Sequence, residues 1–278
     1  MSANPSGPSP PLVVGLPDPV VTLSVVRWRN EILECTTDRI AEEIPVAILC
    51  NGEPHAVMLM SPMDVQDFAL GFALTEGLIN EPRELVLVES SVLDDGIQLD
   101  LTLPMYHPRS ADMHARSLAG RSGCGLCGKR MMEDALRTPA AVAGGSDVVR
   151  TAITRGVAAL SDRQTHNRET GAVHAAAWVD LDGNIVALRE DIGRHNALDK
   201  LIGARARGTF APGFVVITSR ASYEIVTKAA MAGISLVAAV SAPTALAVRL
   251  ATTCGVTLAG FVRGSDLVLY SHAGRIVG

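Results

Sequence analysis

The sequence predicts an α/β protein with a large core and a smaller β-rich lobe at its N-terminal end. Three observations support this prediction. Short apolar runs before Leu103 are separated by hairpin turn signals, as in antiparallel strands. After Pro139, apolar strand-like runs alternate with helix-like patterns. The chain has 278 residues, of which 48% are hydrophobic, so it is long and apolar enough to bury a sizeable core.

The smaller lobe is predicted to span residues 20–110, after a Pro/Ser/Gly-rich stretch, residues 1–19, that is typical of a flexible tail. Within the lobe, strand-like runs flank Asn51-Gly52, a dipeptide that favours two-residue hairpin turns. A second hairpin is predicted from Leu85 to Leu103, with its turn at Asp95-Gly96. We therefore expect this lobe to consist mainly of strands.

A helix is predicted between the two hairpins, starting at Ser61-Pro62 and ending near Gly77. Ser61 is expected to be its N-cap, and Asp64 lies near the positive end of the helix dipole. Its buried face is formed by Val65, Phe68, Ala69 and Phe72. We interpret it as a packing helix.

The larger core is predicted at residues 139–278. Strands are expected at Val173–Val179, Ile185–Leu188, Phe214–Thr218, Leu236–Val240, Val256–Val262 and Leu267–Tyr270, with Asp182-Gly183 as the turn between the first two. Helices are expected over residues 147–164, around Ala197 to Ile202, at Ser222–Met231 and at Pro243–Thr253. Because strands that alternate with helices are typical of βαβ units, we expect a largely parallel sheet that is covered by helices on both faces.

Composition excludes several classes of function. The net charge of −5 argues against a dedicated nucleic-acid-binding protein. No apolar run approaches the ~20 residues that span a bilayer, and the N-terminus shows no secretory signal. Five cysteines, an odd and low number, fit a reducing compartment better than a disulfide scaffold. We therefore expect a cytoplasmic protein without a membrane partner.

The most distinctive stretch is Gly123-Cys124-Gly125-Leu126-Cys127-Gly128, in a loop and helix that we place at residues 111–138. The two thiols, Cys124 and Cys127, lie three positions apart among glycines. Three cations flank them: Arg121, Lys129 and Arg130. Nearby positive charge and a following helix N-terminus favour the thiolate form of cysteine, which is the form that attacks sulfur.

Several interpretations of this thiol pair are open. The thiols form a nucleophilic or sulfur-carrying site, half of a zinc site, a thioredoxin-like dithiol, or an inert structural pair. Zinc usually needs four ligands, and the other cysteines are isolated: Cys35, Cys50 and Cys254. A thioredoxin-like motif follows the first strands of its fold, whereas more than a hundred residues precede this one.

Three predicted strand-to-helix corners of the core carry polar side chains: residues 190–196, 218–222 and 241–244. In open α/β sheets, ligands bind at the carboxyl ends of strands beside helix N-termini. Arg194 and Arg220 at these corners suit phosphate groups, and Arg263 follows the last long strand.

A structural interpretation of the same corners is also open. Arg194 would pair with Asp191 or Asp199, and the serines would only cap helices. His195 and Asp199 are four positions apart, so on a helix they would form a hydrogen-bonded pair.

Five motifs together resemble the formate dehydrogenase accessory sulfurtransferase family, from about residue 44 to the C-terminus. They are residues 124–128 (CGLCG), 170–176 (TGAVHAA), 190–200 (EDIGRHNALDK), 222–228 (SYEIVTK) and 241–244 (SAPT). The third is the most specific, because it holds many polar residue types in a fixed order.

The resemblance implies a fold and an activity. The fold would be a cytidine deaminase-like three-layer core with an additional N-terminal lobe. The activity would be that of a sulfurtransferase: a cysteine desulfurase supplies sulfur, which Cys124 carries as a persulfide. The sulfur then passes to the molybdenum or tungsten bis-molybdopterin guanine dinucleotide cofactor, which formate dehydrogenase needs. Members of the family are typically homodimers.

The resemblance also implies a cofactor-binding segment near the C-terminus. Its residues here are Phe261, Val262, Arg263, Gly264, Ser265 and Asp266. Together with Arg194, Ser219 and Arg220, they would bind the guanine nucleotide ends of the cofactor, so a GDP-like nucleotide would also fit. Where the family usually has Ser-Gly-Arg, this chain has Thr218-Ser219-Arg220, so a side chain occupies the place of the glycine.

Two other functions are weighed against sulfur transfer. A zinc deaminase needs a glutamate two residues after its histidine ligand, but His174 is followed by Ala175 and Ala176, so the general acid/base is missing. The alternative of a different class is a non-catalytic chaperone that binds the cofactor and uses its thiols in a structural zinc or dithiol site.

Overall fold

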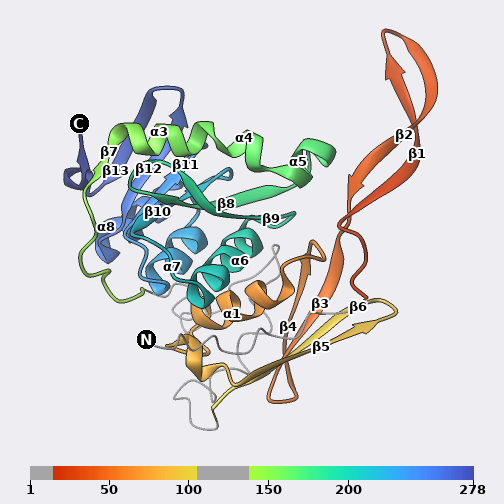
Figure 1. Cartoon of the computed structure of the whole chain (residues 1–278), viewed down its shortest axis with the longest axis horizontal. Coiled ribbons are helices and arrows are strands. Elements are labelled where there is room, and N and C mark those ends of the chain that lie inside the picture. The colour runs from red at the N-terminus through yellow and green to blue at the C-terminus, as the bar shows by residue number, and fades with distance from the viewer. Residues whose placement is uncertain (1–14, 105–137) are drawn as a thin grey trace, which may run out of the picture.

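The structure is a computed structural model that describes residues 15–104 and 138–278. A six-stranded sheet forms the centre of the larger lobe, and a four-stranded sheet forms the base of the smaller lobe (Figure 1). Helices separate the two sheets, and a two-stranded arm extends from the smaller lobe. None of the helices in the described ranges is long and apolar enough to cross a membrane.

The six-stranded sheet has the order β13-β12-β11-β10-β8-β9. The strands are β8 (His174–Asp180), β9 (Ile185–Asp191), β10 (Gly213–Ile217), β11 (Leu236–Ala239), β12 (Thr257–Arg263) and β13 (Asp266–Ser271). Only the β10–β11 and β11–β12 pairs are parallel. The expectation of a largely parallel sheet was therefore wrong. Short turns after β8 and β12 reverse the chain, so β9 and β13 are antiparallel to the strands that precede them. Only α7 (Tyr223–Met231) and α8 (Ala245–Cys254) provide crossovers between parallel neighbours of this sheet.

Helices cover both faces of this sheet, as predicted. One face packs against α6 (Arg194–Arg207), α7 (Tyr223–Met231) and α8 (Ala245–Cys254), and the other against α3 (Arg150–Ala158). The predicted helix over 147–164 is broken: β7 (Val148–Val149) precedes α3 and pairs with β14 (Ile276–Val277), and α4 (Leu160–Arg163) and α5 (Thr165–Thr170) follow. The result is a helix–sheet–helix layering.

The smaller lobe contains a four-stranded sheet of order β4-β3-β6-β5. Its strands are β3 (Ile44–Cys50), β4 (Glu53–Met60), β5 (Leu87–Leu93) and β6 (Gly96–Thr102), and the short 3₁₀ helix η1 (Pro82–Glu84) precedes β5. The hairpin turn at Asn51-Gly52 is confirmed, with positive φ at both residues. The second hairpin turns one residue earlier than expected, at Asp94-Asp95, because Leu93 already pairs with Gly96.

The helix of this lobe, α1 (Val65–Thr75), starts later than predicted. Its N-cap is Asp64, with φ of 52°, and not Ser61. Ser61 is instead used in long-range contacts: its hydroxyl accepts a hydrogen bond from the backbone N–H of Ile192, and its own N–H donates to Asp191. The local capping pattern was overridden by these tertiary contacts.

Two glycines let α1 pack closely against α6, as expected for a packing helix. A Cβ on Gly71 would overlap the backbone carbonyl of Asp199, and a Cβ on Gly203 would overlap that of Asp67. The buried carboxylate of Asp67 also forms ion pairs with Arg189 and Arg207. The helices therefore form a tight seam that joins the two lobes.

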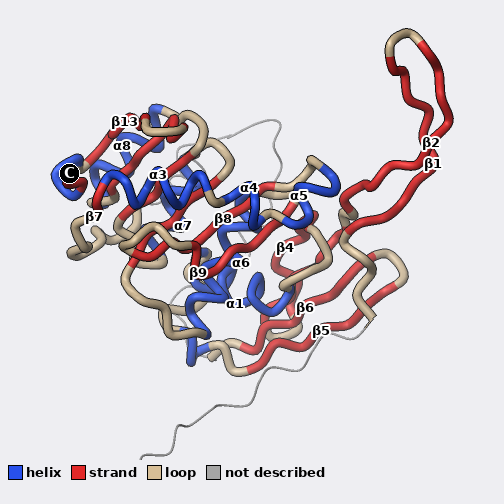
Figure 2. The backbone as a smooth tube through the Cα atoms, turned by 45° about the horizontal axis from the view of Figure 1, so that its top comes forward, coloured by secondary structure: helices blue, strands red, loops and turns tan. Residues whose placement is uncertain are grey.

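The first two strands, β1 (Val20–Arg29) and β2 (Ile32–Ala41), form an antiparallel ribbon that projects from the body (Figures 1 and 2). We call this ribbon the arm. Asn30 and Glu31 both have positive φ, which matches the right-handed twist of a two-residue hairpin. At its base, Arg39 pairs with Glu169 of α5 at 2.5 Å.

Candidate functional site

The predicted polar corners lie at one edge of the six-stranded sheet, which we call the strand-end edge. Strands β9, β10, β11 and β12 run in the same direction, so their carboxyl ends lie together, with the first residue of β8 among them. Two contacts join neighbouring corners: Ala221 pairs with Pro243 in an isolated bridge, and Phe261 donates a backbone hydrogen bond to Ser241.

Asp191, at the end of β9, is fully buried at this edge and forms a 2.6 Å ion pair with the equally buried Lys200 of α6. Its carboxylate also accepts hydrogen bonds from Ser61, Gly193 and Asn196. Gly193 has little space for a side chain, because a Cβ there would lie 2.7 Å from the Asn196 amide. The contacts of the Asp191 carboxylate are therefore structural. Arg194 is not among its partners, so the expected pairing of Arg194 with Asp191 is wrong.

Asp199 is the centre of a second buried group. Its carboxylate accepts hydrogen bonds from Thr75 of α1 at 2.7 Å and from Lys228 of α7 at 2.8 Å. The expected hydrogen-bonded pair of His195 and Asp199 is therefore also wrong. Most polar residues of the motif at 190–200 thus fix the packing of α6. Arg194 and His195 are the residues of this motif at the strand-end edge that are not part of the two buried groups.

His195 contacts the first turn of α7. Its Nε2 lies 2.7 Å from a carboxylate oxygen of Glu224 and 3.4 Å from the hydroxyl of Ser222. The hydrogen bond with His195 lowers the pKa of Glu224. Because both partners meet the same ring nitrogen, the three residues do not form a catalytic triad, in which the acid and the hydroxyl bind opposite nitrogens. Ser222 also caps α7, as predicted.

His174, at the start of β8, lies beside these groups. Burial lowers its pKa, and the charges of Arg194 and His195 lower it further, while Asp191 acts in the opposite direction. Its Nδ1 is 3.5 Å from the Thr218 hydroxyl, which also accepts a hydrogen bond from the Ala175 backbone. A neutral imidazole is therefore favoured at His174.

Three arginines of the strand-end edge are free of ion pairs with the described residues: Arg194, Arg220 and Arg263. The buried Nε of Arg194 has no hydrogen-bond partner among them either. Arg220 and Arg263 are exposed. Guanidinium groups without a carboxylate partner are suited to bind phosphate.

The predicted cofactor-binding segment forms the β12–β13 hairpin. Arg263 lies opposite Asp266 across its turn, and the Ser265 carbonyl accepts a hydrogen bond from Arg150 at 2.7 Å. Phe261 has a φ of 52° at a β-bulge and a side chain that is 42% exposed. Val262, in contrast, is buried in the core, so only its backbone is left to meet a ligand.

Ser219, where the resemblance implies a glycine, is only 4% exposed. Its hydroxyl donates to the carbonyl of Arg220 at 3.1 Å. The polar group of the Ser219 side chain is thus satisfied by a local hydrogen bond.

Cys124 and Cys127 lie outside the described residues, as does the helix predicted after Gly128. Within the described ranges, no group of three or more His, Cys, Asp and Glu side chains is arranged to hold a metal ion. The isolated thiols of Cys50 and Cys254 are buried, and that of Cys35 is exposed.

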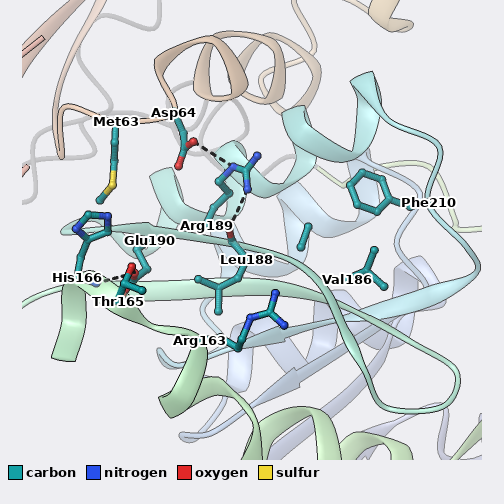
Figure 3. Close-up of a pocket in the computed structure, with 11 residues that line it drawn as sticks. Met63, Asp64, Arg163, Thr165, His166, Val186, Leu188, Arg189, Glu190 and Phe210 are labelled. Carbon is teal, nitrogen blue, oxygen red and sulfur yellow. Dashed lines mark hydrogen bonds and ion pairs between the residues drawn. The ribbon is translucent and has the colours of Figure 1, made fainter.

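An open cavity of about 460 Å³ lies along β9, with walls from the start of α1 and from α4 and α5 (Figure 3). Its charged groups are largely paired: Arg189 contacts Asp64 at 3.5 Å, and Glu190 accepts hydrogen bonds from the first N–H groups of α5. None of the predicted site residues lines it. The residues that line this cavity come from segments that are distant in sequence, so no local sequence pattern predicts the cavity.

Sequence reasoning missed Glu224 and His174 as members of the strand-end edge. Both lie in motifs that were noticed, residues 222–228 and 170–176, but their proximity depends on how β8 and α7 pack against α6. A signal was present for Glu224, because a carboxylate in the first turn after a serine cap is well placed to meet a histidine on a neighbouring helix.

Comparisons with known proteins cover almost the whole chain. The model of the FdhD/NarQ family matches residues 41–277. A sulfur carrier protein FdhD from Xanthomonas euvesicatoria pv. vesicatoria is 46% identical over 258 residues, 92% of each chain. A protein of the same name from Cupriavidus necator is 46% identical over 92% of this chain and 89% of its own.

A solved structure also matches. It is the crystal structure of a protein from Desulfotalea psychrophila, described as a formate dehydrogenase accessory protein. The TM-score is 0.71, with 21% identity over 94% of this chain and 100% of the other. At this level of identity, the match supports the fold alone.

Proposed function

The chain belongs to the FdhD/NarQ family, and from this premise we propose that it is a sulfur carrier for the maturation of formate dehydrogenase. In this proposal, it acts as a sulfurtransferase that receives sulfur from a cysteine desulfurase. It delivers the sulfur to the bis-molybdopterin guanine dinucleotide cofactor of molybdenum or tungsten, which is its substrate. We also propose that the larger core has a cytidine deaminase-like fold.

Cys124 is the proposed carrier. Its thiolate attacks the outer sulfur of the desulfurase persulfide, the sulfur–sulfur bond in the desulfurase breaks, and the desulfurase cysteine leaves as a thiolate. Cys124 then holds the outer sulfur as a persulfide. The cations Arg121, Lys129 and Arg130, which neighbour it in sequence, support the thiolate form. No external oxidant is needed, because one persulfide is exchanged for another.

The strand-end edge is the proposed docking place for the nucleotide ends of the cofactor. The observation that carries this part is the set of three arginines without ion-pair partners in the described chain: Arg194, Arg220 and Arg263. Their charge suits phosphate, and the exposed ring of Phe261 offers a flat surface on which a base can stack. His174 and His195 add polar groups beside Arg194.

Mass spectrometry tests the sulfur-carrying step directly. After incubation with cysteine and a cysteine desulfurase, the protein is expected to gain one sulfur atom, and peptide mapping is expected to place it on Cys124. Omission of the desulfurase is the control. A protein that gains no sulfur, or that carries near-stoichiometric zinc on both thiols, would contradict the proposal and favour a structural role of the cysteines.

Nucleotide binding tests the docking part separately. Arg194→Ala, Arg220→Ala and Arg263→Ala are each expected to weaken GDP binding about tenfold or more, because a hydrogen bond to a charged group contributes roughly 1.5–3 kcal/mol. Isothermal titration calorimetry measures the loss. The matched control is Arg83→Ala, which removes an exposed arginine of the smaller lobe. Equal GDP affinity in all four variants would contradict docking at this edge.

A further inference from the structure

The cavity beside β9 lies at the rim of the six-stranded sheet (Figure 3). β9 is the last strand in the order of this sheet, so no described strand pairs with its outer side. Five consecutive residues of β9, 186–190, line the cavity. Since successive side chains of a strand point to opposite faces, a cavity that all five residues line runs along the edge of the strand. The backbone of β9 is therefore part of the cavity wall.

The pairing of β8 shows which backbone groups of β9 point outward. The carbonyl of Ala175 accepts a backbone hydrogen bond on the β10 side of β8. Because bonding directions alternate along a strand, the next residue, Ala176, bonds toward β9, where it lies opposite Arg189. The N–H and C=O groups of Leu188 and Glu190 therefore point away from β8, to the outer side. We call these groups the β9 edge.

The β9 edge is only partly used by the chain itself. The carbonyl of Leu188 accepts a hydrogen bond from the side chain of Arg189 at 2.9 Å. The N–H groups of Leu188 and Glu190 have no acceptor among the described residues. The strand also contains neither proline nor lysine, the residues that commonly protect an edge from pairing. Donors and acceptors spaced in this way match an added strand.

The unpaired charge of the cavity wall is positive. Arg189 contacts the carboxylates of Asp64 and Asp67 at 3.5 and 2.7 Å, and Glu190 accepts hydrogen bonds from the first N–H groups of α5. Figure 3 shows Arg163 on the other side of β9 from Asp64. Its exposed guanidinium forms no ion pair with a described residue. A carboxylate on the ligand suits this position.

The length and the apolar surface of the cavity suit an extended chain. The five residues of β9 that line it span roughly 13 Å, the length of four or five residues of a strand. Val186, which is 42% exposed, and Leu188 are alternate residues, so their side chains lie on one face. Met63 and Phe210 lie toward opposite ends of the cavity (Figure 3). Apolar side chains at alternate positions of the ligand find apolar neighbours there.

We propose that this cavity binds an extended peptide segment of a partner protein, which adds as a further strand on the β9 edge and places an acidic side chain against Arg163. Main-chain hydrogen bonds to the β9 edge supply affinity, and the guanidinium of Arg163 selects the acidic residue. A compact ligand without a repeating backbone leaves the N–H groups of Leu188 and Glu190 unmatched. The strand-end edge and the thiols of the CGLCG motif take no part in this contact.

Fluorescence anisotropy with the full chain and a synthetic probe tests the strand addition. The probe is a fluorescein-labelled peptide of alternating valine and glutamate, expected to bind with a sub-millimolar dissociation constant. Two derivatives carry N-methyl groups, one on every valine amide and the other on every glutamate amide. Because only alternate amides of an added strand face its neighbour, one derivative is expected to bind about tenfold or more weakly than the other. Equal affinity of the two derivatives would overturn the proposal.

Charge reversal tests the role of Arg163. Arg163→Glu is expected to weaken binding of the glutamate peptide about tenfold or more, and to bind a lysine-for-glutamate peptide more tightly than wild type does. The matched control is Arg168→Glu, which changes an exposed arginine of α5 outside the cavity. Equal effects of the two substitutions would overturn the proposal.

Other occupants of the β9 edge give a different result. Wild type that binds no probe, because residues 1–14 or a second copy of the chain already covers the edge, would also overturn the proposal. Sulfur loading of Cys124 is measured separately, so a failure of peptide binding is distinct from a failure of the proposed function.

Discussion

Lys200→Met is expected to lower the free energy of unfolding by about 3–5 kcal/mol, because it leaves the carboxylate of Asp191 buried without a counter-charge. Both side chains are fully buried, and the Lys200 amine also donates to the carbonyl of Ser61. Methionine keeps most of the volume of lysine, so the loss comes from charge and hydrogen bonding rather than from a cavity.

Chemical denaturation of the full chain measures this loss. Arg205→Met is the control on the same helix: it removes a guanidinium that stacks on Trp178 at 4.5 Å and donates to the Ala232 carbonyl, and we expect a loss of about 1–2 kcal/mol. If Lys200→Met were no more destabilising than Arg205→Met, Asp191 would not depend on its partner for its place in the core.

Cys124→Ala is expected to abolish the ability of the protein to support formate dehydrogenase activity, because alanine has no sulfur with which to form a persulfide. The measurement is formate oxidation in cells whose only copy of the gene carries the substitution. Cys127→Ala, compared in the same assay, shows whether the second thiol is needed for the same step.

The matched control for Cys124→Ala is Cys50→Ala. Burial, followed by the nearby charge of Asp100, raises the pKa of Cys50 to about 12, so its thiol stays protonated at neutral pH and is no nucleophile. We expect this variant to retain activity as long as it folds, which its circular dichroism spectrum reports. Full activity in the Cys124→Ala strain would remove the basis of the proposed carrier role.

Local features of the fold followed well from the sequence. The turn at Asn51-Gly52 and the cap at Ser222 depend on a few neighbouring residues, and both are present in the structure. Each works through its own backbone preferences or through a hydrogen bond within one turn.

Features that depend on distant residues did not follow. Ser61 has the sequence of an N-cap, but its hydroxyl instead accepts a hydrogen bond from the backbone N–H of Ile192, 131 positions later. The strand directions were inferred from alternation, although the turn predicted at Asp182-Gly183 already required an antiparallel pair. At the candidate site, the polar corners were predicted. The partner of His195 on α7 and the partners of Asp199 on α1 and α7 were not predicted.

The long-range bonds of Ser61 also bear on synthesis of the chain on the ribosome. The N–H of Ser61 meets its acceptor 130 residues later, and Arg189 meets Asp67 after 122 residues. At 5–20 residues per second, a gap of 130 residues lasts roughly 6–26 s. During that interval the nascent smaller lobe has an unpaired aspartate on α1 and an uncovered helix face, which makes it a natural client for chaperones that bind chains as they emerge.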